Sequence, residues 1–102
     1  MRNLRTLDEV EETYLRQHPD EVDEYVRILF DEFAQDKDIS ALLASLRIVS
    51  RVKGVTDVAR NAGMSRKGLQ KALSENGNPQ FESMAYIMQA MGYRFAVQNI
   101  SG

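Results

Sequence analysis

The residues of this sequence best suited to bind another molecule stand where a helix is expected to begin. In the stretch "NAGMSRKGLQKALSENG", residues 61–77, Ser65 is of the type that caps a helix, and Arg66 and Lys67 follow in its first turn. The partial positive charge of a helix N-terminus disfavours cations there by roughly a few tenths of a kcal/mol each. Either the two cations meet an anion outside the chain, or their placement is incidental.

Basic side chains continue along the same face of this expected helix. Leu69, Ala72 and Leu73 share the side that would be buried. The opposite side is polar and basic, and it holds Arg66, Lys67, Gln70, Lys71 and Ser74. Arg and Lys can pair with guanine O6 and N7, and Gln can read adenine. This face predicts DNA binding, and a solvated basic face in an ordinary helical bundle is the alternative.

Other kinds of side-chain chemistry have little support. The sequence contains no cysteine, so it has no disulfide and no cysteine-ligated zinc. His18, its one histidine, precedes Pro19 and lacks the sequence partners that a metal site or a general base needs. No phosphate-loop glycine pattern and no nucleophile motif is present in the sequence. We therefore expect no enzymatic activity, no metal and no cofactor.

The length and the hydropathy of the sequence indicate how many domains the protein has and whether it is secreted or inserted in a membrane. A chain of 102 residues, 43% of them hydrophobic, has the size of one domain, and we expect residues 1–102 to form one. The start, "MRNLRTLDEV", lacks the apolar stretch of a signal peptide. The most apolar segment, "ISALLASLRIV", contains Arg47 and is too short to span a bilayer. We expect a cytoplasmic protein with no membrane partner.

The net charge of −2 conceals two halves of opposite sign. Residues 1–46 hold twelve acidic and five basic residues, a net charge of −7. Residues 47–102 hold three acidic and eight basic residues, a net charge of +5. Such asymmetry indicates two surfaces for two kinds of partner, and charge complementarity within the chain is the alternative.

Apolar spacing predicts a mainly α fold, a bundle of five to six helices. Acidic N-terminal helices are expected within residues 1–53, with Pro19 opening the second and Asp38 capping the third, which ends at Gly54. The second helix has one apolar face, made of Val22, Tyr25, Val26, Leu29, Phe30 and Phe33. The third has another, made of Ile39, Leu42, Leu43, Leu46, Val49 and Val52.

Residues 55–92 carry the spacing of a helix-turn-helix. Two short helices are expected on either side of Gly63, the first capped by Thr56 and the second by Ser65. Ala59 is small, as needed where the helices cross, and Leu69 would be buried against the first helix. Asn78 and Pro79 would open one more helix, whose apolar positions are Phe81, Met84, Met88 and Met91.

The last segment, residues 93–100, alternates in a way that predicts a short β-strand. Tyr93, Phe95 and Val97 alternate with polar or small residues. A lone strand leaves its backbone unpaired, and "RNLRT" near the start is only a weak partner. We expect this strand to pair with a second copy of the chain, which makes Tyr93, Phe95 and Val97 dimer contacts.

Residues 55–97 resemble a known family. The order of "AGMSR", "KALS", "GNP" and "MGYRFAV" resembles lambda-repressor-like (Xre-type) helix-turn-helix domains, and more closely the HigA-like antitoxins, the antidote proteins of bacterial addiction modules. The resemblance extends more loosely over about 80 residues. It implies that Ser65, Arg66 and Lys67 open the recognition helix and that Gln70 and Lys71 lie one turn further on. Gln70 departs from the often aromatic residue of the family, so the operator sequence stays open.

The resemblance implies an antitoxin of a type II toxin–antitoxin module. Such a protein is a dimeric autorepressor that binds a palindromic operator in double-stranded DNA and neutralises a basic, RNase-like toxin. We expect Thr56, Ser65, Arg66, Lys67, Gln70 and Lys71 to bind DNA. We expect the acidic N-terminal helices to bind the toxin, with Glu11, Tyr14, Leu15 and Asp23 among the contacts. A phage-type or chromosomal repressor without a toxin, and an adaptor that no longer contacts DNA, are the alternatives.

Overall fold

A computed structural model describes residues 7–101 of the chain, which form six α-helices and no β-strand within that range. The acidic N-terminal part contains α1 (Leu7–Gln17), a 3₁₀ turn (Pro19–Glu21) and α2 (Val22–Asp36). The central helix is α3 (Ile39–Lys53), and α4 (Val55–Asn61), α5 (Arg66–Ala72) and α6 (Phe81–Ala90) follow. The mainly helical fold predicted from apolar spacing is confirmed.

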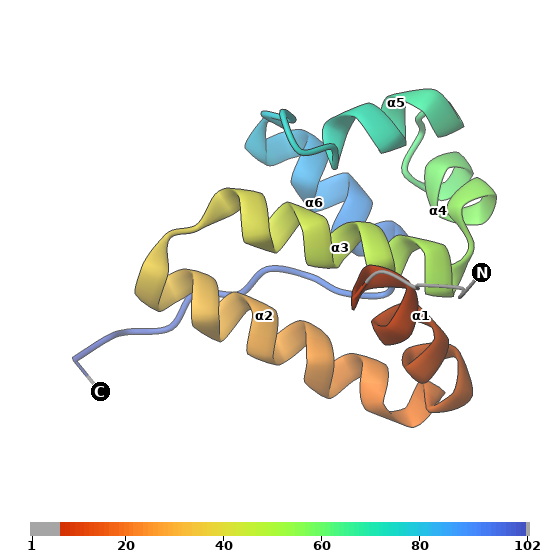
Figure 1. The fold of residues 1–102 in the computed structure, drawn as a ribbon. Coiled ribbons are helices and arrows are strands. Elements are labelled where there is room, and N and C mark those ends of the chain that lie inside the picture. The colour runs from red at the N-terminus through yellow and green to blue at the C-terminus, as the bar shows by residue number, and fades with distance from the viewer. Residues whose placement is uncertain (1–6, 102) are drawn as a thin grey trace.

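Helix α3 lies in the middle of the molecule. It packs against α1 and α2 and, further along, against α4, which in turn packs against α5 and α6. In Figure 1, α1 and α2 lie on one side of α3, and α5 lies on the other. The acidic and the basic parts of the sequence are therefore held on opposite sides of one central helix.

The predicted apolar stripes form one hydrophobic core, with two exceptions. Leu43, Leu46 and Val49 of α3 have no exposed surface, and Met84, Met88 and Met91 are buried around α6. Ile39 and Phe81, each the first residue of its helix, are exposed instead. Ile87, which the predicted stripe omitted, is fully buried.

The helix ends follow the sequence signals in part. Asp38 caps α3, since its Oδ1 accepts a hydrogen bond from the Ala41 N–H at 3.1 Å. Gly54 ends α3 with a φ of 103°, which L side chains rarely adopt. The expected start of α6 at Asn78 and Pro79 is wrong, because α6 begins at Phe81 after Gln80. The turn between α5 and α6 requires glycine at position 77, because the Cβ of any other residue would clash with the Ala72 carbonyl oxygen.

The predicted C-terminal strand is wrong for the described residues, of which 93–99 form neither strand nor helix. A strand needs a partner whose backbone groups it can pair with, and residues 7–101 supply none. The segment is held by side chains instead. The Tyr93 hydroxyl donates to Asp23 Oδ1 at 2.6 Å, and Phe95 packs edge-on against Phe30 with ring centres 5.8 Å apart. The weak candidate partner at residues 2–6 lies outside the described residues.

Among residues 7–101, no helix is long and apolar enough to cross a membrane.

Candidate nucleic-acid interface

Helices α4 and α5 form a tight pair joined by a short turn. Gly63 adopts a φ of 72° in this turn, a value that glycine takes without strain. The Met64 N–H donates to the Ala59 carbonyl at 2.9 Å, and the Ala59 side chain is buried where the helices meet. Leu69 is buried on the inner side of α5. The helices and turn lie where the sequence predicted them.

The two predicted caps of this pair have different outcomes. Ser65 caps α5 as expected, since its hydroxyl oxygen accepts a hydrogen bond from the Gly68 N–H at 2.9 Å. The expectation that Thr56 caps α4 is wrong, because α4 begins one residue earlier, at Val55. Gly54 ends α3 and precedes α4 directly, so Thr56 lies inside the first turn of α4 with its side chain exposed.

The far end of α5 is fixed by a residue that the sequence analysis did not connect with it. The Arg47 guanidinium of α3 donates a hydrogen bond to the Leu73 carbonyl, which follows the last residue of α5. A cation there also opposes the negative end of the helix dipole. Because α3 is the central helix, this contact links the end of α5 to the middle of the protein.

The outer face of α5 is exposed and positively charged. Arg66, Lys67, Gln70 and Lys71 are all exposed. Within residues 7–101, none of these side chains forms an ion pair or a side-chain hydrogen bond. Four arginines elsewhere in the described chain form ion pairs, for example Arg27 with Glu24 and Arg60 with Asp57. The cations of α5 are therefore available to an anion from outside.

A second basic feature, which we name the arginine hollow, lies beside the start of α4. It has a volume of about 320 Å³ and is lined by Arg16, Arg51, Gly54, Val55, Thr56, Asp57 and Arg66. These residues come from α1, α3, α4 and α5, which the fold brings together. The arginine hollow extends the basic face of α5 towards Thr56, so three guanidinium groups, the Asp57 carboxylate and one hydroxyl border one concave surface.

Glu12 orders two of these arginines. Its carboxylate accepts from Arg16 at 2.7 Å and from Arg51 at 2.7 Å. Burial alone would raise the pKa of Glu12, but the hydrogen bonds from Arg51 and Arg16 outweigh burial and lower it. Glu12 therefore stays ionised at neutral pH and holds both guanidinium groups at the edge of the arginine hollow.

The residues predicted to bind a toxin do not all lie together. Glu11 and Tyr14 border a hollow between α1 and α2, and Leu15 lies at its floor, only 3% exposed. Asp23 lines a different hollow and accepts the hydrogen bond from Tyr93. Among the predicted dimer contacts, Val97 is fully exposed, whereas Tyr93 is half-buried within its own chain.

A metal site is not formed in the described part of the chain. Across residues 7–101, no group of three His, Cys, Asp or Glu side chains is arranged to hold a metal ion.

In comparisons with known proteins, the sequence matches one family model and one relative. The sequence model of a family described as "probable addiction module antidote protein" matches residues 6–99. An uncharacterized protein of Haemophilus influenzae is 37% identical over 76 residues, which are 74% of this chain and 78% of that protein. No solved structure matches the chain significantly.

The cap of α5 generates a stability prediction. Replacing Ser65 with Ala removes the acceptor of the Gly68 N–H and should lower the free energy of unfolding by ~1 kcal/mol. Thr56→Ala is the matched control, since Thr56 makes no cap in the described chain, and it should change stability by less than ~0.5 kcal/mol. Urea unfolding measures both, and equal losses in the two variants would contradict the assignment of the caps.

Proposed function

The chain belongs to the family described as "probable addiction module antidote protein", and on this premise we propose that it is the antitoxin of a type II toxin–antitoxin module. In this proposal it binds and neutralises a basic, RNase-like toxin. It also binds operator DNA as a dimer and represses its own transcription. Family membership supports the antitoxin role, and the basic face of α5 supports the role in DNA binding.

The proposed DNA binding is supported mainly by one observation, that the exposed cations of α5 have no anionic partner among the described residues. Arg66, Lys67 and Lys71 are exposed, and each lacks an anionic partner within residues 7–101. Phosphate oxygens and guanine edges would supply such partners, and Gln70 on the same face could read adenine. We take α4 and α5 as a helix-turn-helix of the lambda-repressor-like (Xre) type, as in HigA-like antitoxins, with α5 as its recognition helix.

The arginine hollow would position the protein on the DNA backbone. Arg16, Arg51 and Thr56 lie beside the start of α5, where a phosphate next to the bound groove would pass. Contacts to phosphates carry no sequence information but fix the register of a protein on the duplex. Helices α1 and α2, which carry most of the acidic residues, lie on the other side of α3 from α5 (Figure 1).

DNA binding is tested by removing the cations in the first turn of α5. Arg66→Ala and Lys67→Ala should each weaken operator binding by ~1–3 kcal/mol where the side chain reads a base, and should relax specificity at that position. Fluorescence anisotropy with the DNA upstream of the gene measures both effects. Lys37→Ala is the control, because Lys37 follows the last residue of α2 and belongs to neither α4 nor α5. A folded double variant with undiminished operator affinity would contradict the assignment and favour a protein-binding adaptor.

The antitoxin half is tested separately by rescue from growth arrest. Expression of a small, basic, RNase-like protein encoded next to the gene should arrest growth, and co-expression of this chain should restore it. The Arg66→Ala, Lys67→Ala double variant should also restore growth, because toxin neutralisation does not use the recognition helix. If the wild-type chain gives no rescue, the protein is a repressor without a toxin.

The proposed repressor is a homodimer, since a palindromic operator is met by two recognition helices ~34 Å apart. Its C-terminal segment offers exposed apolar side chains for this contact, Phe95, Val97 and Ile100. Tyr93 would act by anchoring the segment to α2 through Asp23. The contact needs no particular backbone conformation of the segment.

The dimer contact is tested by placing charge on these side chains. Val97→Asp combined with Ile100→Asp should convert the dimer to a monomer in sedimentation velocity, because two carboxylates would be buried unpaired. Gln98→Asp combined with Asn99→Asp is the matched control and should leave the dimer intact. Equal behaviour of both double variants would place the dimer contact elsewhere.

A further inference from the structure

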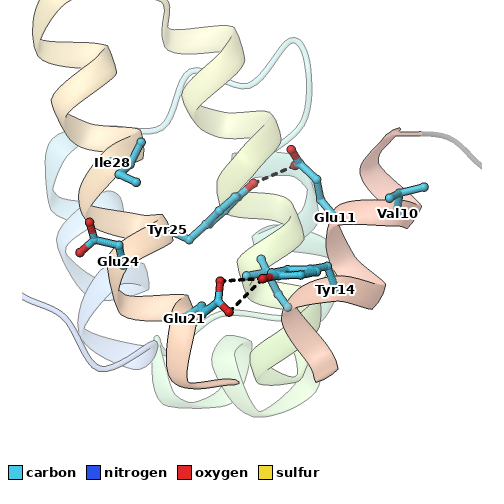
Figure 2. Close-up of a pocket in the computed structure, with 8 residues that line it drawn as sticks. Val10, Glu11, Tyr14, Glu21, Glu24, Tyr25 and Ile28 are labelled. Atoms are coloured by element: carbon cyan, nitrogen blue, oxygen red, sulfur yellow. Dashed lines mark hydrogen bonds between the residues drawn. The ribbon is translucent and has the colours of Figure 1, made fainter. Parts of the chain in front are cut away.

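An apolar hollow with an acidic rim lies between α1 and α2, and we name it the α1–α2 hollow. It has a volume of about 410 Å³ and is lined by Val10, Glu11, Tyr14, Leu15, Glu21, Glu24, Tyr25 and Ile28. Figure 2 shows the Tyr14 and Tyr25 side chains between the two helices, with Glu11 directed towards Tyr25 and Glu21 towards Tyr14. The α1–α2 hollow is separate from the arginine hollow and from the outer face of α5.

Several apolar side chains around the hollow are exposed to solvent, whereas an ordinary solvated helix face is made mostly of polar side chains. Val10 is 50% exposed, Tyr14 46% and Ile28 42%, and the buried Leu15 forms the floor between the helices. Exposed apolar surface gathered in a concave site with a polar rim is typical of surfaces that bind another protein.

Two carboxylates of the rim are held in place without being neutralised. The Tyr14 hydroxyl donates to both oxygens of Glu21 at 2.9 Å, and the Tyr25 hydroxyl donates to Glu11 Oε1 at 2.9 Å. Glu24, in contrast, is paired with Arg27. Neither Glu11 nor Glu21 forms an ion pair within residues 7–101. Both carboxylates lie at the edge of an apolar surface without a cationic partner among the described residues.

The tyrosines hold these carboxylates over the whole physiological pH range. Burial raises the pKa of Tyr25 to about 12, with the hydrogen bond to Glu11 acting in the same direction. The hydrogen bond to Glu21 likewise raises the pKa of Tyr14. A tyrosine hydroxyl is protonated at neutral pH even without such a shift, so both hydroxyls are donors there, and the carboxylates do not need to be reoriented when a ligand arrives.

The chemistry of the hollow selects a cationic side chain with a long apolar stem. The aliphatic part of an Arg or Lys side chain can lie against Val10, Ile28 and the tyrosine rings, and its charged end can reach Glu11 or Glu21. A cation over the face of a tyrosine ring gains further attraction. Nucleic acid is excluded as the occupant, because phosphates would meet the carboxylates of a half-chain with a net charge of −7.

We infer that the α1–α2 hollow is the docking site for the toxin and receives an arginine or lysine side chain of that basic protein. This inference rests on the proposed antitoxin function and names the surface that performs it. The α1–α2 hollow shares no lining residue with the arginine hollow or with α5, so the toxin and operator DNA can be held by the same chain. Leu15 takes part only as the floor of the hollow, whereas Asp23 lies outside it, because Asp23 lines a different hollow and accepts the hydrogen bond from Tyr93.

The experiment compares full-length variants for binding to the purified toxin encoded next to the gene. Glu11→Gln combined with Glu21→Gln should raise the Kd at least about tenfold in calorimetry and should reduce its salt dependence, because two charge pairs with the toxin are lost. Val10→Ser combined with Ile28→Ser should also raise the Kd at least about tenfold, through lost apolar contact. Glu32→Gln combined with Glu82→Gln is the matched control for net charge and should change the Kd less than about threefold.

Circular dichroism and operator binding, both expected to be unchanged, show that each variant is folded. If both hollow variants bind the toxin as the wild type does, the docking site is wrong and the antitoxin function stands. If the wild-type chain does not bind the toxin, the proposed function fails and the inference with it. If the Val10, Ile28 variant sediments as a monomer where the wild type is a dimer, the hollow is a contact between copies and the inference is overturned.

Discussion

The burial of α3 against its neighbours on both sides holds the acidic and the basic parts of this protein in one body. Leu43, Leu46 and Val49 have no exposed surface, and α3 contacts α1, α2 and α4. Loss of such a side chain leaves a cavity that costs ~2–5 kcal/mol, a large share of the stability of a small domain. The positions of the α1–α2 hollow and of helix α5 both depend on this packing.

Polar contacts from α3 refine those positions. Arg51 reaches Glu12 of α1, and Arg47 reaches the carbonyl of Leu73 at the end of α5. Partly exposed pairs of this kind contribute little to stability, so their main effect is to orient the helices that they join. The charges left for partners are of opposite sign on the two sides of α3, cations on α5 and the carboxylates of Glu11 and Glu21 near α2. Binding to either kind of partner would be fast at low salt and weaker at high salt.

The sequence by itself determined the elements that depend on local signals. The apolar period of residues 22–33 specifies a helix with one buried face, and Asp38 and Ser65 cap the helices that follow them. Gly54 and Gly63 mark the turns because only glycine takes their positive φ without strain. The exposed basic face of α5 follows from the same period, since burial of Leu69 and Leu73 leaves Arg66 and Lys67 outside.

The tertiary structure decided what depends on residues far apart in the chain. The strand predicted from alternation at Tyr93, Phe95 and Val97 does not form among the described residues, because a strand is defined by a partner, and the tyrosine and phenylalanine pack on α2 instead. The arginine hollow gathers side chains from four helices, and the α1–α2 hollow joins Glu11 to Tyr25 and Tyr14 to Glu21. Helical period gives the face on which a residue lies, but only the packing of one helix on another decides which residue it meets.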